Sequence, residues 1–339
     1  MVYIVAEIGC NHNGDMELAR KLVDAAIESG VDAVKFQTFK ADKLISKHAP
    51  KADYQIETTG NSESQLEMTK KLEMSFDEYL EIKKYTESKG VDVFSTAFDD
   101  ESLNFLISTG MDIFKIPSGE LTNLTYLEKI GKQKKKVILS TGMAVMSEIH
   151  DAVDILEKNG TTDITILHCT TQYPTLSEDL NLHVITTLQK EFPNNKIGYS
   201  DHSVGHFAAT VAAGMGSSFI EKHFTLDTNL PGPDHHASAT PEVMTEVVKG
   251  VRFVEKAMGS YEKEPVAVEI KNKIVARKSI IAATNITKGE VFTEKNITTK
   301  RPGNGISPMK WYEVLGTVAE RDFEEDEVIE SSKFKGQEL

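Results

Sequence analysis

Short β-branched apolar stretches alternate, from residue 2 to about residue 258, with longer stretches in which apolar residues recur every three or four positions. Short runs of this kind predict strands, and the longer period predicts helices that bury one face. Eight strands are expected, at residues 2–9, 33–38, 93–98, 114–119, 136–142, 164–171, 196–202 and 219–225.

Helical patterns separate these predicted strands. In residues 16–30 the side chains of Leu18, Leu22 and Ala25 fall on one face, and Gly30 ends the pattern. Residues 76–90 are built in the same way. Eight strands that are each followed by a helix predict a (β/α)₈ TIM barrel. A doubly wound open sheet is the alternative, but no glycine-rich phosphate motif follows the first strand.

The pattern changes at two places. The longest interruption, residues 39–75, follows the second strand and is predicted to be an active-site loop. After the barrel domain, residues 1–258, we expect a linker at 259–275 and a small β-rich domain at 276–339, where short strands and KG and PG turns replace the helices.

Composition narrows the function classes. The 339 residues carry a net charge of −14, so the long-range field opposes binding to nucleic acid or to an anionic membrane. The cysteines, Cys10 and Cys169, give no disulfide framework. The start of the chain lacks a basic segment and a cleavage site, and no apolar run approaches 18 residues. We therefore expect a cytoplasmic protein.

The predicted strands end in polar residues, and in a barrel the chemistry lies at these C-terminal ends. A single buried polar residue is usually a satisfied core group, but polar ends on eight strands together favour a binding site. The residues are Glu7, Lys35, Gln37, Thr96, Lys115, Ser118, Ser140, Thr171, Tyr173, Ser200, His202 and His223.

Two chemistries are suggested by these residues. His202 and His223 end adjacent strands and could hold one divalent ion, Mn, Fe, Co or Zn, or Mg with oxygen ligands, and Asp234 in the next loop is a further candidate. Lys35 and Lys115, with hydroxyls at 118, 140 and 200, suit a phosphate or carboxylate. The alternative for each lysine is pairing with a nearby acid, such as the glutamates at 7 and 120.

Several motifs resemble the sialic acid synthase family, in particular its bacterial N-acetylneuraminate synthases. They are AEIGCNHNGD (6–15), VKFQTFKADKL (34–44), FKIPSGE (114–120), LSTGM (139–143), HCTTQYPT (168–175), GYSDHS (198–203), EKHFTLD (221–227) and GPDH (232–235). KRPGNGIS (300–307) resembles the family's C-terminal antifreeze-like (SAF) domain. The resemblance extends over essentially the whole chain.

The resemblance implies a carbon–carbon bond-forming transferase that condenses phosphoenolpyruvate with N-acetylmannosamine and water, giving N-acetylneuraminate and phosphate. It implies a divalent metal, Mn²⁺ first with Mg²⁺ or Co²⁺ as alternatives, on His202 and His223. Phosphoenolpyruvate contacts are implied for Lys35, Thr96, Lys115, Ser118, Ser140 and Ser200. Residues around the sugar and the reacting carbons are Glu7, Gln37, Glu120, Tyr173 and Asp234, with Glu7 and Glu120 as candidate bases and Lys35 and Lys115 as catalytic cations.

One departure bears on the sugar. Thr171 stands where the sialate-forming pattern commonly has Asn, as in relatives that make legionaminate, so the alternative product is N,N'-diacetyllegionaminate from a diacetylated 6-deoxy-mannose analogue. The resemblance also implies a domain-swapped homodimer in which Arg301 reaches the sugar site of the other subunit. Between residues 269 and 301, eight basic residues against three acidic ones fit an anionic target.

The sequence is also compatible with two other classes of function. A Schiff-base aldolase would use Lys35 or Lys115 as a nucleophile on pyruvate and would tolerate EDTA. A sugar-binding or ice-binding module is suggested by the tail, although the polar strand ends count against it. Phosphate release from phosphoenolpyruvate distinguishes the synthase from both.

Overall fold

The computed structural model describes residues 1–60 and 62–334 and divides the chain into two compact units, Met1–Gly259 and Ser260–Leu339. Among the described helices, none is long and apolar enough to cross a membrane.

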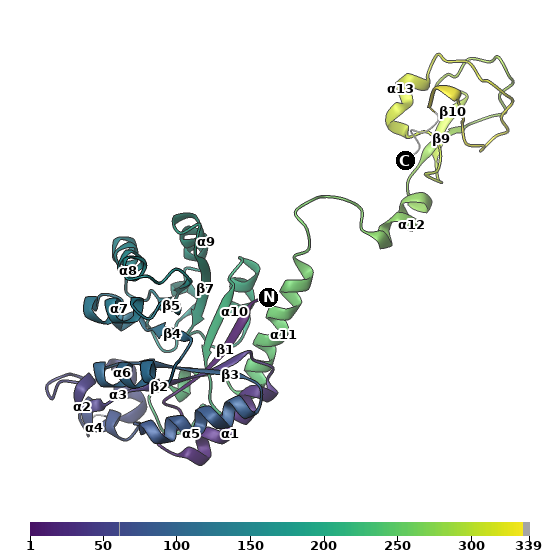
Figure 1. The fold of residues 1–339 in the computed structure, drawn as a ribbon. Coiled ribbons are helices and arrows are strands. Elements are labelled where there is room, and N and C mark those ends of the chain that lie inside the picture. The colour runs from purple at the N-terminus through teal and green to yellow at the C-terminus, as the bar shows by residue number, and fades with distance from the viewer. Residues whose placement is uncertain (61, 335–339) are drawn as a thin grey trace. The chain divides into compact units, whose positions relative to one another are not determined.

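The first unit is built on a closed barrel of eight parallel strands in sequence order, with the last strand pairing with the first (Figure 1). The prediction of a (β/α)₈ barrel is therefore confirmed, and the open-sheet alternative is excluded. The strands are β1 Tyr3–Gly9, β2 Ala33–Thr38, β3 Asp92–Ala97, β4 Ile113–Ile116, β5 Lys136–Ser140, β6 Ile164–His168, β7 Lys196–Asp201 and β8 Phe219–His223.

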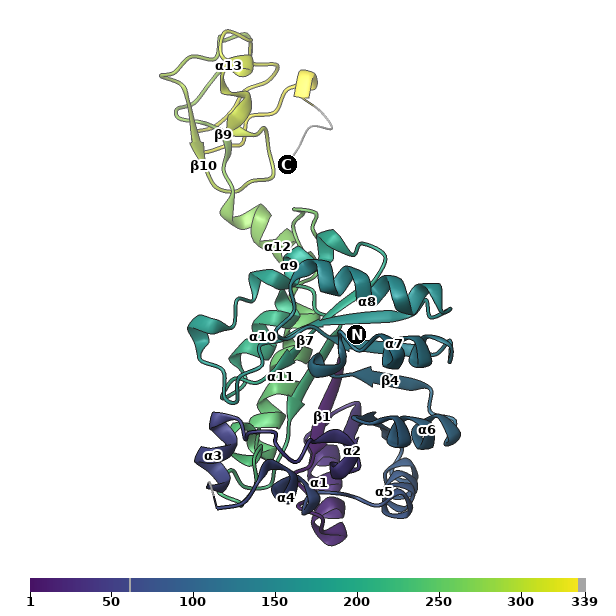
Figure 2. The same ribbon diagram turned by 90° about the vertical axis from the view of Figure 1, so that its left-hand side faces the viewer.

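Helices surround the strands, as the two views in Figures 1 and 2 show. The α-helices are α1 Met16–Glu28, α2 Ala41–Leu44, α3 Asp53–Thr59, α4 Gln65–Lys70, α5 Phe76–Ser88, α6 Asp100–Ser108, α7 Leu124–Gly131, α8 Met146–Lys158, α9 His183–Glu191, α10 Phe207–Gly214 and α11 Pro241–Ala257. Short 3₁₀ turns are η1 Ser118–Glu120, η2 Ser177–Asp179 and η3 His235–Ala237.

Local sequence explains where the helices begin and which face they bury. The Asp15 carboxylate accepts from the backbone N–H of Glu17 at the start of α1, and Ser75 and Glu78 form a reciprocal cap on α5. Helix α1 then buries Leu22 and its neighbours at helical spacing against the strands. This burial, repeated around the barrel, forms one continuous apolar core.

Strand ends are the main difference from the sequence-based expectation. The fourth strand was expected to reach residue 119, but β4 ends at Ile116. Pro117 has no N–H to donate to a ladder, and the chain turns into η1 from Ser118 onward. The polar residues at this end therefore lie on a turn above the barrel rather than on the strand.

The second unit is small and rich in β-structure, as expected. Strands β9 Ser279–Ala282 and β10 Ile297–Lys300 pair antiparallel over a core that includes Ile280, Phe292 and Phe323. The remaining elements are α12 Ala267–Ala276, η4 Pro308–Lys310, α13 Trp311–Val314 and η5 Ser332–Phe334. Helix α12 occupies most of the segment that was expected to be a linker.

The KRPGNGIS turn is packed within this second unit. The Ser279 hydroxyl donates to the Pro302 carbonyl at 2.6 Å and accepts from the Gly305 N–H at 2.9 Å. A Cβ on Gly305 would lie 2.2 Å from Val328, so the close approach requires glycine here. Arg301 at the root of this rigid turn is exposed, and its Nε donates to the Ala276 carbonyl at 3.0 Å.

Candidate active site

A cavity of about 490 Å³ opens at the C-terminal ends of the barrel strands. Every strand, or the residues directly after it, contributes a polar side chain to its wall. The barrel interior is apolar and changes to a polar layer at this end. The active sites of TIM barrels usually lie at this end. The polar contributors are Glu7, Lys35, Gln37, Thr96, Lys115, Ser140, Thr171, Ser200, His202, Glu221 and His223.

Two lysines and two glutamates form a buried charge cluster in this wall. The Lys35 ammonium lies 2.7 Å from Glu7 Oε2 and 3.8 Å from Glu221 Oε1. Lys115 lies 3.3 Å from the same Glu221 oxygen and donates to the Ser140 hydroxyl at 2.7 Å. Because the charges are paired, the cluster can remain ionised away from water.

Burial sets the protonation of these groups. It raises the pKa of Glu7 to about 7, although Lys35 acts in the opposite direction. Burial lowers the pKa of Lys115. For Glu221, burial opposes the charge, but Lys115 and Lys35 outweigh it and hold the pKa below its usual range. Glu7 is therefore the carboxylate of the cluster that can exchange a proton near neutral pH.

One acceptor in the cluster has no donor within the described chain. Glu221 Oε2 is buried without a hydrogen-bond partner among the described residues, while Oε1 accepts from the Ser200 hydroxyl at 3.3 Å. A buried carboxylate oxygen without a donor is costly, so this atom is available to a hydroxyl of a bound molecule.

A tight turn places further hydroxyls at the cavity. Ser118 Oγ accepts from the Gly142 N–H at 2.9 Å and lies 3.2 Å from the Cys169 sulfur. A Cβ on Gly142 would lie 2.2 Å from the Thr171 hydroxyl, so only glycine allows these loops to meet. The turns after β4, β5 and β6 are thereby held together at the rim.

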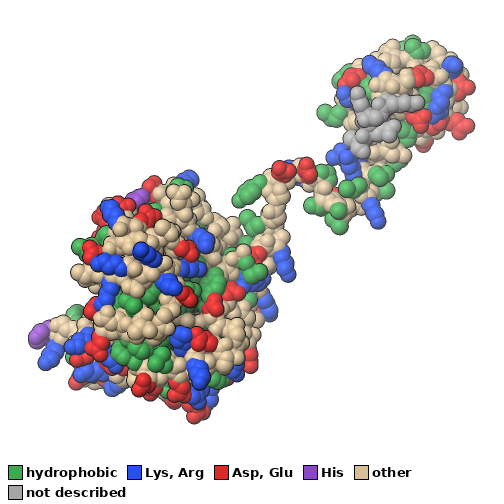
Figure 3. All heavy atoms as spheres, viewed as in Figure 1, with side chains coloured by type: hydrophobic (Ala, Val, Ile, Leu, Met, Phe, Trp, Pro, Cys, Tyr) green, Lys and Arg blue, Asp and Glu red, His purple; other side chains and the backbone are tan. Residues whose placement is uncertain are grey.

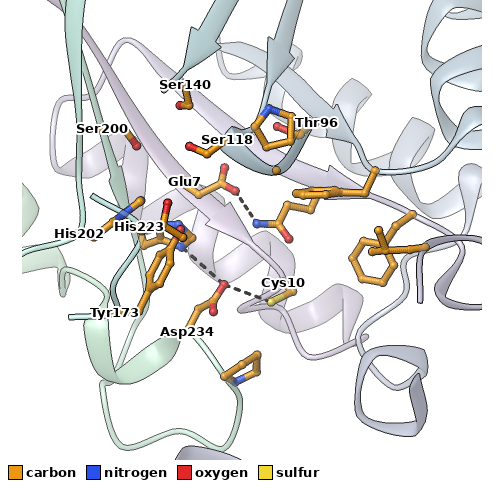
Figure 4. A pocket seen from close by; sticks show the side chains of 18 of the residues that line it. Glu7, Cys10, Thr96, Ser118, Ser140, Tyr173, Ser200, His202, His223 and Asp234 are labelled. Atoms are coloured by element: carbon orange, nitrogen blue, oxygen red, sulfur yellow. Dashed lines mark hydrogen bonds and ion pairs between the residues drawn. The ribbon is translucent and has the colours of Figure 1, made fainter. Parts of the chain in front are cut away.

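The two histidines lie together on the other side of the cavity. Their ring centroids are 5.5 Å apart, and the Tyr173 ring lies 4.2 Å from that of His202 (Figure 4). His202 Nδ1 lies 2.7 Å from the Thr170 carbonyl oxygen, which can only accept. Nδ1 therefore carries the proton, and the Nε2 lone pair is free to bind a ligand.

Both imidazoles are neutral at pH 7. Burial lowers the pKa of His202 to about 4, and burial, followed by the neighbouring His202 and lysines, brings the pKa of His223 well below its usual value. Neutral imidazole is the form that binds metals. Within residues 1–60 and 62–334 no cluster of three or more His, Cys, Asp or Glu side chains could hold an ion. The two imidazoles fit a metal that takes its other ligands from substrate and water.

Asp234 reaches the cavity from the loop after β8. Its Oδ2 lies 3.7 Å from His223 Nδ1 and accepts a hydrogen bond from the Cys10 thiol at 3.5 Å, so that Asp234 lies between these two residues in Figure 4. Burial raises the pKa of the Asp234 carboxyl to about 6.

The structure brings most of the sequence-predicted site residues to one cavity, and two lie elsewhere. Glu120 on η1 does not line it; its carboxylate accepts from the Asn123 side chain at 2.6 Å. Arg301 belongs to the second unit. Lining the cavity are Glu7, Lys35, Gln37, Thr96, Lys115, Ser118, Ser140, Thr171, Tyr173, Ser200, His202, His223 and Asp234.

Sequence reasoning missed some of the lining residues. Glu221 stands two positions before His223 on β8, so the strand period of two could have identified it. Cys10 and Cys169 also line the wall. The 39–75 loop lines the cavity as expected, but its individual contributors had no signal in the sequence: Phe39, Leu44, Ile45, Gln55, Gln65, Met68, Thr69 and Leu72.

Comparison with known proteins matches both parts of the chain to known families. Residues 22–263 match the NeuB family and residues 277–335 match the SAF domain. The chain is 48% identical to the N,N'-diacetyllegionaminic acid synthase of Campylobacter jejuni, over 96% of this chain and 98% of that one. It is 44% identical to the enzyme of the same name from Legionella pneumophila, over 93% and 89%.

A solved structure with the same fold is the N-acetylneuraminic acid synthetase of Leptospira borgpetersenii. It is 35% identical, with a TM-score of 0.70, and the match covers 80% of this chain and 90% of that one.

Proposed function

This chain belongs to the NeuB family of sialic acid synthases and ends in an SAF domain, and on that premise we propose that it is an N,N'-diacetyllegionaminate synthase. In the proposed reaction, phosphoenolpyruvate and water condense with the open-chain form of a diacetylated 6-deoxy-mannose analogue, giving N,N'-diacetyllegionaminate and phosphate. The observation that carries the proposal is a cavity in which a buried lysine–glutamate cluster lies together with two neutral imidazoles.

The choice of sugar rests on similarity. The relatives at 48% and 44% identity both carry the legionaminate name, and the residue at 171 is Thr rather than the Asn of the sialate pattern. These observations favour the diacetylated sugar, the alternative of the sequence analysis, over N-acetylmannosamine.

Lys35 and Lys115 supply the positive charge that the phosphate and carboxylate of phosphoenolpyruvate require. Thr96 and Ser140 hold the two ammonium groups, at 3.2 and 2.7 Å, so the charges are oriented before substrate arrives. Preorganised cations in the cavity stabilise the charge that develops on the departing phosphate.

His202 and His223 would hold the divalent metal, Mn²⁺ first with Mg²⁺ or Co²⁺ as alternatives. When bound, such an ion supplies Lewis-acid polarisation of the sugar aldehyde. Tyr173, tilted against the His202 ring, and Asp234, beside His223, limit where the aldehyde end of the sugar can lie.

In the proposed bond changes, C3 of phosphoenolpyruvate attacks the aldehyde carbon and leaves an electron-poor C2. Water adds to C2, and Glu7 accepts the proton, since its pKa near 7 leaves it partly ionised at neutral pH. The resulting tetrahedral carbon expels phosphate by cleavage of its C–O bond, and its hydroxyl loses its proton and becomes the C2 ketone. The proton held by Glu7 passes to the former aldehyde oxygen, which becomes a hydroxyl. Glu120 was the other candidate base, but its side chain lies outside the cavity.

We propose further that the enzyme acts as a domain-swapped homodimer in which Arg301 of one copy binds oxygen groups of the sugar in the other copy. The support is apolar surface that a second copy would cover. Phe207 on α10 is 75% exposed and Phe253 on α11 is 69% exposed. Four apolar side chains of α12 are also exposed: Val268, Ile270, Ile274 and Val275.

A phosphate-release assay tests the proposed activity. The protein, loaded with Mn²⁺, is given phosphoenolpyruvate with each sugar in turn and with no sugar, and each reaction is repeated in EDTA. We expect phosphate only when a sugar and the metal are both present. Sugar-independent phosphate release, or turnover that survives EDTA together with trapping by borohydride, would instead support a different lyase chemistry.

A further inference from the structure

Two glutamine side chains reach the cavity from the loop between β2 and α5. Gln55 lies on α3 and Gln65 begins α4, and both line the cavity wall. Gln65 Nε2 donates to Gln55 Oε1 at 3.2 Å, so the two amides are joined into one unit.

The orientation of this amide pair follows from its hydrogen bonds. Gln55 Oε1 also accepts from the backbone N–H of Ala52 at 3.0 Å, and a backbone N–H can only donate, so this atom is the oxygen. Gln55 Oε1 therefore also accepts the hydrogen bond from Gln65 Nε2. Among residues 1–60 and 62–334, the groups of the pair that remain without a hydrogen-bond partner are therefore a donor, Gln55 Nε2, and an acceptor, Gln65 Oε1.

The wall around this pair is neutral. Of the described residues in the 39–75 loop that line the cavity, none is charged, and Leu44, Met68 and Leu72 add apolar surface there. The buried cation of the loop, Lys51, is directed to the Thr59 hydroxyl and the Gly60 carbonyl, both at 3.0 Å. A phosphate or carboxylate would find no counter-charge on this wall, whereas a neutral group with a methyl would be accommodated.

We propose that Gln55 and Gln65 form a subsite for the second acetamido group of the sugar. The acetamido carbonyl accepts from Gln55 Nε2, its N–H donates to Gln65 Oε1, and its methyl packs on the apolar side chains of the wall. This inference rests on the proposed function and deepens it: the pair is what distinguishes a diacetamido sugar from one with a hydroxyl at that carbon. A hydroxyl has no methyl and one oxygen, so it leaves part of the amide pair unsatisfied.

The sharpest variant is Gln55→Glu. Glutamate keeps the oxygen that caps α3 at Ala52 and accepts from Gln65. It replaces the Gln55 Nε2 donor with a second acceptor and adds a negative charge, which the control variant Gln133→Glu adds as well. Gln65→Leu is the second variant and removes the acceptor. Gln133→Glu is the matched control. Gln133 lies beyond the end of α7, donates to the Lys129 carbonyl and does not line the cavity.

The measurement is kcat/KM for two 6-deoxy sugars that differ only in the second acetamido group, one with that group and one with a hydroxyl in its place. The ratio of interest is kcat/KM for the diacetamido sugar divided by kcat/KM for the hydroxyl sugar. We expect Gln55→Glu and Gln65→Leu each to lower this ratio about tenfold or more, and Gln133→Glu to leave it as in the wild type. Circular dichroism and thermal unfolding confirm that each variant is folded.

The outcomes separate this inference from the proposed function. If the wild type itself prefers N-acetylmannosamine to the diacetylated sugar, the proposed function fails. If the wild type prefers the diacetylated sugar and both variants keep the wild-type ratio within twofold, whatever their absolute loss, the subsite is overturned and the proposed function stands.

Discussion

Glu7 joins two properties that a base in this cavity needs. Its carboxylate is held in place by the Gln37 amide at 2.9 Å and by Lys35, and burial raises its pKa to about 7. A base accepts a proton only when it is ionised, so kcat/KM should fall as the pH drops below about 7, approaching tenfold per pH unit.

Replacing this carboxylate provides the matching mutation. Glu7→Gln keeps the shape and the oxygen facing Gln37 but removes the base, and we expect kcat to fall about 10²- to 10⁴-fold. A pH profile of kcat/KM for the wild type and the variant checks both statements. A wild-type profile that is flat from pH 5.5 to 8 would remove Glu7 from the role of base.

The two histidines give a second prediction at this scale. Because each imidazole would supply one of only two protein ligands, His202→Ala or His223→Ala should lose Mn²⁺ binding, measured by calorimetry, together with turnover. His206→Ala is the control, since this histidine precedes α10 and does not line the cavity. Full activity of either ligand variant in EDTA-treated buffer would contradict the metal assignment.

At the scale of elements, the β1–α1 loop holds the loop that carries Asp234. Asn11 Nδ2 donates to the Phe224 carbonyl and to the Ser238 hydroxyl, both at 2.9 Å, and Asn13 Nδ2 donates to the Pro231 carbonyl at 2.8 Å. These bonds span both ends of the β8–α11 loop, so the placement of Asp234 depends on them.

Asn11→Ala should therefore act mainly on the sugar. We expect kcat/KM for the sugar to fall about tenfold to a hundredfold, because a small displacement of a positioning group is costly, and the melting temperature to fall as well. The KM for phosphoenolpyruvate should change less, since Lys35 and Lys115 lie on β2 and β4. Asn104→Ala, exposed on α6, is the control. Equal losses for both substrates would show that this loop has no selective role.

An element could be predicted from the sequence where a local pattern of residues determines it, and could not where contacts in the folded chain determine it. Strand β2 was predicted at its observed bounds because a β-branched run with Lys35 and Gln37 in register is a local signal. The end of β4 was missed because Pro117 and the following turn decide it. The roles of Gln55 and Gln65 could not be predicted, since they depend on how α3 and α4 fold over the cavity.

At the scale of the whole molecule, the exposed apolar surface bears more on the proposed dimer than the charge distribution does. On the face of the barrel unit shown in Figure 3, acidic and basic side chains are interspersed rather than gathered by sign. Exposed apolar side chains on α10, α11 and α12 are the features that point to a second copy.

Subunit complementation tests the dimer. Arg301→Ala and His202→Ala should each be inactive alone, but a mixed dimer would contain one site with both residues intact if Arg301 serves the partner. We expect mixing and subunit exchange to restore up to about one quarter of wild-type activity, since half of the dimers are mixed and each has one working site. Confirmed exchange without recovered activity would show that Arg301 acts in its own copy.

The central claim, that this cavity condenses phosphoenolpyruvate with a diacetylated 6-deoxy sugar, is tested most directly by competition. The Mn²⁺-loaded protein receives limiting phosphoenolpyruvate and equal concentrations of the diacetylated sugar and N-acetylmannosamine, and mass spectrometry measures the two products. Their initial ratio equals the ratio of kcat/KM values. We predict that N,N'-diacetyllegionaminate exceeds N-acetylneuraminate by about tenfold or more. An excess of N-acetylneuraminate, or the absence of both products, would contradict the claim.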